Sequence, residues 1–195
     1  MLVTLNEILK MAEERGCAIG AFNTPNLECI RAVIDTAEKY DVPVIISHAE
    51  LHEEVAPLDV IGPVMVLSAR NAKVPVCVHL DHCETLDYMA RALEIGFTGV
   101  MYDGSLLPYE RNVANTMKAV AMAKPYRAGV EAEIGQLASR EGGMGENAGG
   151  PVYTDPDLSG RPVLTLWHPA LVLPMAFTNP SLFWTWIGLP LSRKE

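Results

Sequence analysis

The chain has 195 residues, of which 49% are hydrophobic, and its formal net charge is −9 at pH 7. This length and apolar content predict one soluble domain with a substantial core. The acidic balance argues against nucleic acid or an anionic membrane as the main partner, and no apolar run is long enough to span a bilayer.

Short apolar runs alternate with helix-like segments from the N-terminus onward. The first helix is predicted from a capping box at Thr4–Glu7, and Gly16 and Gly96 stand where helix C-caps are expected. The predicted helices are 4–15, 27–40, 61–72, 86–95 and 113–123. The predicted strands are 18–22, 42–46, 74–78, 99–102 and 129–134. This alternation predicts an α/β fold with a parallel sheet.

Polar side chains follow each apolar run. Asn23 follows the first, Ser47 and His48 the second, and Asp103 the fourth, while Glu131 and Glu133 share one face of the fifth. A barrel fits this pattern better than a doubly wound sheet, because barrels place their sites at the carboxyl ends of the strands. The chain is short for a complete (β/α)8 barrel of roughly 250 residues, so we expect a partial one with about the first five βα units.

The third run ends in His79-Leu80-Asp81-His82, which brings a carboxylate and an imidazole to a strand terminus. Alternation sends neighbouring strand residues to opposite faces, but a turn after the strand would let Asp81 and His82 reach the same site. A His beside an Asp suits metal-assisted proton transfer. An ordinary polar strand end is the alternative interpretation of this tetrapeptide on its own.

Other candidates are weaker. His48 and His52 have helical spacing that would allow both imidazoles to bind one metal, but a substrate-side loop with a solvated His52 is the preferred interpretation. The four cysteines form no CxxC pair, so we expect reduced thiols, with Cys83 packing near the site rather than binding a metal. The N-terminal segment does not resemble a signal peptide, and a cytoplasmic location is expected.

Four motifs together resemble the class II ketose-bisphosphate aldolases, in their order and spacing. They are Gly20-Ala21-Phe22-Asn23, His79-Leu80-Asp81-His82, Tyr102-Asp103-Gly104-Ser105 and Val130-Glu131-Ala132-Glu133-Ile134-Gly135-Gln136-Leu137. Tyr153-Thr154-Asp155-Pro156 also matches, and the resemblance covers residues 1–158, most closely to the fructose- and tagatose-bisphosphate branch.

The resemblance implies a zinc enzyme that reversibly cleaves a ketose phosphate to dihydroxyacetone phosphate and an aldehyde, as in glycolysis. It implies that His82 is a zinc ligand and that Asp103 and Glu133 bind a second divalent or monovalent cation, or an alternative position of the metal. Asp81 would be the acid/base for the substrate hydroxyl, and Glu141 would move the proton of the enediolate. Substrate binding is implied for Asn23 and Ser47, with a phosphorylated sugar as the partner and homo-oligomers among full-length relatives.

The Gly-rich segment that follows Glu141 fits a loop that closes over the site, and a mobile surface loop is the equal alternative.

The family pattern stops after Leu158. The expected Gly-Thr-Ala-His-Gly strand end, a later histidine ligand and the phosphate-binding turns do not occur in residues 159–195. This tail is rich in Pro and Trp, and its prolines argue against a central strand. We therefore expect residues 159–195 to be an irregular segment distinct from the partial barrel of residues 1–158.

The genetic code offers an explanation for the tail. In the frame that takes the last base of each codon with the first two bases of the next, Trp167-His168 must encode Ala and Met175-Ala176 must encode Gly. Residues 172–175 permit Gly-Thr-Ala-His in that frame. A frameshift is therefore our preferred interpretation, with a divergent tail as the alternative. We expect a chain lacking these motifs to be inactive, and a non-catalytic remnant or partner subunit is the rival function.

Overall fold

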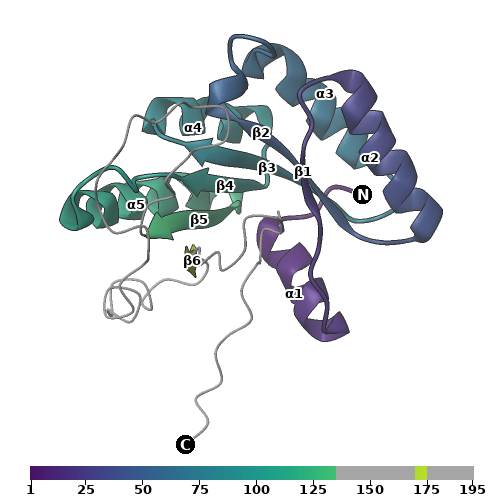
Figure 1. The fold of residues 1–195 in the computed structure, drawn as a ribbon, viewed down its shortest axis with the longest axis horizontal. Helices are drawn as coiled ribbons and strands as arrows, with labels where there is room; N and C mark the ends of the chain where they lie inside the picture. The colour runs from purple at the N-terminus through teal and green to yellow at the C-terminus, as the bar shows by residue number, and fades with distance from the viewer. Residues whose placement is uncertain (135–169, 175–195) are drawn as a thin grey trace, which may run out of the picture.

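The computed structural model describes residues 1–134 and 170–174, and these residues build a parallel sheet covered by helices on one face (Figure 1). The strand order in space, β1-β2-β3-β4-β5-β6, is the order along the chain. The strands are β1 (Ala21–Asn23), β2 (Val44–Ala49), β3 (Val76–Cys83), β4 (Gly99–Tyr102), β5 (Gly129–Ile134) and β6 (Ala170–Pro174). Consecutive parallel strands joined by helices are the connection from which (β/α) barrels are built.

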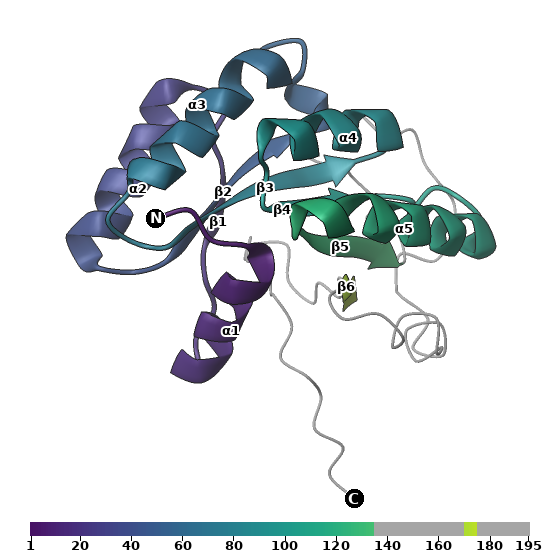
Figure 2. The ribbon, with the colours of Figure 1, turned by 180° about the vertical axis from the view of Figure 1, so that it is seen from behind.

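Each of the first four crossovers carries one long helix. These helices are α2 (Leu27–Tyr40), α3 (Leu58–Asn71), α4 (Leu86–Ile95) and α5 (Tyr109–Ala123). Helix α1 (Leu5–Arg15) precedes β1, and two short 3₁₀ helices, η1 (Glu50–His52) and η2 (Lys124–Tyr126), lie in the connections. Helices α2 to α5 cover one face of the sheet, and α1 lies apart from them (Figure 2). None of the described helices has the length and apolar character needed to cross a bilayer.

The helix ends follow from local chemistry. The predicted capping box is present, because the Thr4 hydroxyl accepts from the Glu7 N–H and the Glu7 side chain accepts from the Thr4 N–H. Gly16 and Gly96 end α1 and α4 with φ of 61° and 109°, a left-handed conformation in which glycine avoids the cost of a Cβ atom. The sequence therefore locates these termini correctly.

The two faces of the strands enter two apolar clusters. The helix-side cluster contains Val78 and Leu80 of β3 together with buried residues of α2 to α5. The inner cluster contains Ile45 of β2 and Cys77 of β3, packed against α1. Because side chains alternate along a strand, the inner face of β3 also carries His79 and Asp81.

Helix α1 packs against the amino ends of the central strands. A Cβ atom on Gly99 or Gly129 would lie 3.0 or 2.8 Å from Leu5 Cβ, so a larger residue at either strand start would force α1 to shift. The helix thus fills the end of the sheet opposite to the polar strand termini, and this leaves the carboxyl ends for chemistry.

Several boundaries differ from the sequence prediction. Strand β1 begins at Ala21 rather than at residue 18, and β2 ends at Ala49 rather than at residue 46. Helix α3 begins at Leu58 rather than at residue 61, where the Glu53 carboxylate accepts from the Leu58 N–H at 2.8 Å. Helix α5 begins at Tyr109, directly after Pro108, rather than at residue 113. Strand β3 continues to Cys83, so Asp81 and His82 belong to the strand and not to a turn after it.

The tail prediction is wrong over one short stretch. Residues 170–174 form β6, which pairs in parallel with β5 in the register Val130↔Ala170. A short strand in this position was not expected for an irregular tail, and the frameshift interpretation itself stays a prediction. The division of the chain at residue 158 falls outside the described residues and stays a prediction.

Candidate metal centre at the strand ends

An irregularity at the end of β3 brings its last residues to the inner face of the sheet. The register with β4 shifts between Leu80 and Cys83, and His82 has φ of 43°. Strict alternation would place His82 on the helix side and Cys83 on the inner side. Instead Cys83 lies in the helix-side cluster, so the bulge reverses the alternation and turns the His82 ring inward.

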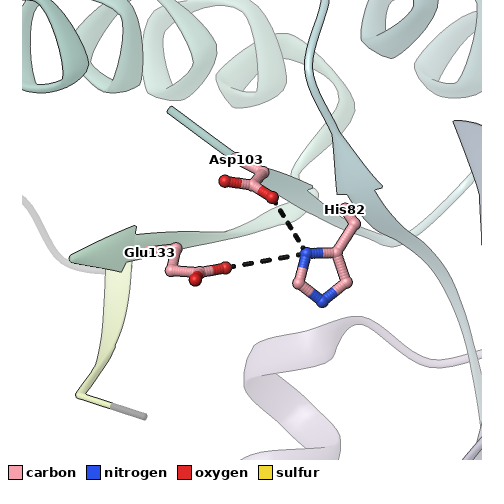
Figure 3. Close-up of side chains that lie close together, drawn as sticks. All are labelled: His82, Asp103 and Glu133. Carbon is pink, nitrogen blue, oxygen red and sulfur yellow. Dashed lines mark hydrogen bonds and ion pairs between the residues drawn. The ribbon is translucent and has the colours of Figure 1, made fainter. Parts of the chain in front are cut away.

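Three side chains from neighbouring strands meet at this position (Figure 3). His82 Nδ1 lies 3.0 Å from Asp103 Oδ2 and 3.6 Å from Glu133 Oε2. One ligand atom of each residue lies within 4.8 Å of the others. Asp103 and Glu133 are buried, whereas the His82 side chain is 21% exposed. The structure thus brings together the three residues that the sequence assigned to metal binding.

The charges at this centre set the protonation of His82. Burial disfavours the imidazolium, but the hydrogen bond to Asp103 and the negative charges of Asp81, Glu133 and Asp103 outweigh it, so the pKa of His82 rises to about 9. Without a cation, His82 therefore carries a proton on the nitrogen that faces the two carboxylates at neutral pH. A bound cation would replace that proton.

Two further residues support this centre, Ser105 at the Asp103 carboxylate and Asn112 at the backbone of Glu133. The Ser105 N–H and hydroxyl both donate to Asp103 Oδ1, at 3.0 and 2.6 Å. The Asn112 side-chain amide donates to the backbone oxygen of Glu133 at 2.8 Å. The sequence analysis assigned neither residue a role. The Asp-Gly-Ser spacing is a signal for the first, because Asp commonly accepts from a backbone N–H two residues on.

The remaining predicted site residues lie in different surroundings. Asp81 is half-buried at the end of β3, and its negative charge helps to raise the pKa of His82. Asn23 and Ser47 pair in register across β1 and β2, where Ser47 is buried and its backbone oxygen accepts from the Thr24 N–H at 2.9 Å. Glu141 lies outside the described residues, as does the Gly-rich segment after it.

A second buried pair lies on the same inner face. His79 Nε2 of β3 is 3.3 Å from Glu131 Oε2 of β5, and both side chains are 6% exposed. Glu131 and Glu133 therefore do share one face of their strand, as predicted, but they contact different histidines. The pairing of Glu131 with His79 was not anticipated, because sequence alone does not give the register between strands separated by β4.

The expected loop with a solvated His52 is not what the structure shows, because His48 lies within β2 and His52 is half-buried in η1. Their rings meet edge to face with centroids 5.7 Å apart, and the His52 Nδ1 accepts from the Ala49 N–H at 3.3 Å. His48 is fully buried and contacts the Tyr88 hydroxyl at 2.9 Å. Within residues 1–134, the group of three or more potential ligands is His82 with Asp103 and Glu133.

Comparison with known proteins identifies the family. The family model for class-II fructose-bisphosphate aldolase matches residues 3–165. The chain belongs to the class II aldolase family. This match extends slightly beyond the Leu158 limit seen in the sequence and includes the whole of the candidate metal centre.

Individual relatives agree with this assignment. The chain is 38% identical over 159 residues to a 6-phospho-5-dehydro-2-deoxy-D-gluconate aldolase of Halalkalibacterium halodurans, covering 80% of this chain and 54% of that protein. It is 35% identical over 159 residues to the D-tagatose-1,6-bisphosphate aldolase subunit GatY of Klebsiella oxytoca, covering 80% of this chain and 55% of the relative.

A solved structure supports the fold. The YdjI aldolase of Escherichia coli K12 superimposes with a TM-score of 0.72 at 31% identity, covering 82% of this chain and 56% of that one. The described strands and helices therefore form part of a (β/α) barrel, as the sequence predicted. The chain spans about half the length of the relatives that it matches.

Proposed function

We propose that this chain carries the metal-binding and proton-transfer half of a class II aldolase. The reaction would be the reversible cleavage of a ketose phosphate or bisphosphate to dihydroxyacetone phosphate and an aldehyde. The observation that carries the proposal is the convergence of His82, Asp103 and Glu133 at the carboxyl ends of three parallel strands, in a chain of this family. Barrel enzymes place their active sites at this edge.

The distances from His82 to the two carboxylates suit a small divalent cation such as zinc. Zinc binds His nitrogen and carboxylate oxygen at about 2.0–2.2 Å, and tetrahedral ligands at that radius are about 3.4 Å from one another. The two distances from His82 Nδ1, 3.0 and 3.6 Å, bracket this value. Asp103 and Glu133 also offer hard oxygen ligands that suit a second divalent or monovalent cation.

The residues around the centre would divide the proton transfers. A cation there would act as a Lewis acid for the negative charge that develops on the ketone oxygen as the carbon–carbon bond breaks. Asp81, half-buried beside His82, would take the proton from the substrate hydroxyl during cleavage and return it during synthesis. Glu141 would move the proton of the three-carbon fragment, and Asn23 and Ser47 would bind the phosphorylated sugar.

Activity of this chain is expected to be absent. Residues 159–195 contain neither of the two further histidine ligands nor the phosphate-binding turns of the family. A site with one histidine would bind its metal more weakly, and each 1.4 kcal/mol of lost transition-state stabilisation lowers the rate about tenfold. Loss of the phosphate turns would also remove binding energy that positions the substrate.

The test compares two purified proteins, this chain and a version whose gene is shifted back into the alternative frame after codon 158. We expect no release of dihydroxyacetone phosphate from fructose or tagatose bisphosphate by the first, and EDTA-sensitive release by the second. Turnover by the short chain near the restored rate would contradict the expected inactivity. EDTA-resistant turnover by the restored chain would contradict the metal mechanism.

A non-catalytic remnant or partner subunit is the second candidate, because the matched relatives are about twice as long as the matched region. Co-expression with the C-terminal half of a relative separates the two functions. Recovery of aldolase activity in a co-purifying complex would support a partner subunit. A chain that neither turns over substrate nor associates with that half would support a remnant.

A further inference from the structure

The carboxylate of Glu50 joins the loop after β2 to the turn that follows His82. Glu50 opens η1, and its Oε2 accepts from the Glu84 N–H at 2.8 Å and from the Thr85 N–H at 3.2 Å. Its Oε1 accepts from the Thr85 hydroxyl at 2.8 Å. One side chain thus holds three donors of a turn that begins two residues after His82.

Glu50 accepts three of the hydrogen bonds at this turn, and the Cys83 thiol donates to the Thr85 backbone oxygen at 3.0 Å. Thr85 is the N-cap of α4, yet its side chain makes no capping hydrogen bond, since its hydroxyl donates to Glu50. Regular pairing with β4 is interrupted between Leu80 and Cys83, and His82 has a left-handed φ that costs energy in a residue with a Cβ atom. A backbone bond from the Asp103 N–H to the Cys83 oxygen, at 2.7 Å, holds the other side.

The loop that carries Glu50 is itself anchored. Glu53 accepts from the Leu58 N–H at 2.8 Å, from the Tyr88 hydroxyl at 2.7 Å and from Arg91 at 3.2 Å. These bonds tie the loop to the starts of α3 and α4. Glu50 therefore projects from a fixed base rather than from a free loop.

We propose that Glu50 is a positioning residue for the metal ligand His82, an inference that rests on the proposed metal-dependent function. By holding the turn, Glu50 keeps the bulge closed and the His82 ring turned towards Asp103 and Glu133. Its contribution is the geometry of the hydrogen bonds, not its negative charge. Residues that orient a ligand in this way influence metal affinity without touching the metal.

Three variants of the full chain test this proposal by Co²⁺ titration, followed through the visible absorption of the bound ion. Glu50→Ala should weaken Co²⁺ binding by about 10- to 100-fold, the usual effect of losing such a support. Glu50→Gln should remain within about threefold of the unaltered chain, because its carbonyl oxygen can still accept from the Glu84 and Thr85 N–H groups. Glu54→Ala, an exposed acidic residue of the same loop, removes an equal charge and should have no effect.

Two outcomes would overturn the proposal. Unchanged Co²⁺ affinity in Glu50→Ala would show that the turn holds without the carboxylate. A loss in Glu50→Gln as large as in Glu50→Ala would show that charge, not geometry, is what Glu50 contributes.

Two measurements separate this inference from the proposed function, one with Co²⁺ and one without metal. If the unaltered chain and a His82→Ala variant bind Co²⁺ equally well, or neither binds it, the metal centre itself is wrong. Amide hydrogen exchange then decides the role of Glu50. Exchange at Thr85 and Asp103 that is at least tenfold faster in Glu50→Ala, but not in Glu50→Gln, would support positioning of the turn. Equal exchange in all variants would overturn it.

Discussion

His48 and His82 stand at the ends of adjacent strands, β2 and β3, and their environments drive their charges in opposite directions. Burial is the first influence on both and disfavours the imidazolium. For His48 the pKa falls to about 4, whereas for His82 it rises to about 9. Burial alone therefore does not decide whether a strand-end histidine is neutral or charged.

The partners of each ring account for the difference. The Tyr88 hydroxyl donates to Glu53, so its oxygen accepts from His48 Nε2, and the neutral His48 ring carries its proton there. His48 Nδ1 is buried and has no hydrogen-bond partner among the described residues, so a second proton would be unsatisfied. After burial, the charge of His52 lowers the pKa of His48 further, and Glu53 only partly opposes it.

The comparison shows what prepares a histidine for metal binding in this fold. His48 keeps the regular alternation of its strand, which places it in the helix layer beside Tyr88. His82 follows a bulge and faces the inner side, where Asp103 and Glu133 supply negative charge. The side of the strand on which the ring lies, and the carboxylates found there, distinguish the two.

The largest expected effect separates the two histidines by metal affinity. We expect His82→Ala to weaken Co²⁺ binding by more than about 100-fold, since even changes behind a ligand cost about 10- to 100-fold. His48→Gln should leave the affinity unchanged, because His48 lies on the helix side of the sheet. Calorimetric titration of both variants measures this. Equal losses in the two variants would remove the distinction between the sites.

The next effect is on stability in acid. Above pH 6.5 the unfolded and folded states both hold His48 neutral. Between pH 6.5 and about 4 only the unfolded state binds a proton at this residue, so the free energy of unfolding falls as the pH falls, by up to roughly 3 kcal/mol. Urea unfolding in EDTA compares the unaltered chain with His48→Gln. The free energy of unfolding should fall less in the variant as the pH is lowered. Parallel curves would contradict a buried neutral His48.

The raised pKa of His82 predicts that the free energy of unfolding falls as the pH rises on the alkaline side. Its folded pKa lies above 6.5, so its contribution to stability is fully present below pH 6.5 and is lost as the pH rises through about 9. In the same urea experiment, the free energy of unfolding of His82→Gln should fall less at alkaline pH than that of the unaltered chain. Its decrease in acid should be unchanged.

The sequence predicted the five βα units because their signals are local. The capping box at Thr4 and the glycines after α1 and α4 fix helix ends through backbone geometry that neighbouring residues determine. The polar strand ends likewise indicated which edge of the sheet holds the site. The contacts of Glu50 and Asn112 were missed because they join segments far apart in the chain, and no local pattern encodes them.

The sequence predicted correctly that Asp81 and His82 face the same side, but it attributed this to the wrong backbone feature. A turn after the strand was expected to bring Asp81 and His82 to one side, but the strand continues and a bulge does so instead. Strand β6 was missed because the prolines of the tail argued against a strand. Pro174 lies in β6, the edge strand of the described sheet, where proline is tolerated.

A smaller effect links the charge of His82 to the metal. Because His82 holds a proton below about pH 9, a cation that binds its Nδ1 must displace that proton. The Co²⁺ affinity should therefore rise by about tenfold per pH unit between pH 6 and 8. His48→Gln should show the same slope. A pH-independent affinity would mean that the cation does not bind through His82.

The smallest expected effect tests whether His48 and His52 bind a metal together or interact only through charge. The charge of His52 is the second influence that lowers the pKa of His48, so His52→Ala should raise that pKa, by less than about one unit. The folded state then accepts its proton at higher pH, and the loss of stability in acid becomes smaller than in the unaltered chain. Ring resonances of His48 followed by NMR between pH 4 and 7 would measure the shift directly. If His48 and His52 instead bound a metal together, His52→Ala would reduce Co²⁺ affinity as His82→Ala does. An unchanged Co²⁺ affinity combined with a raised His48 pKa would establish that the pair interacts only through charge, and that metal binding belongs to the inner face of the sheet.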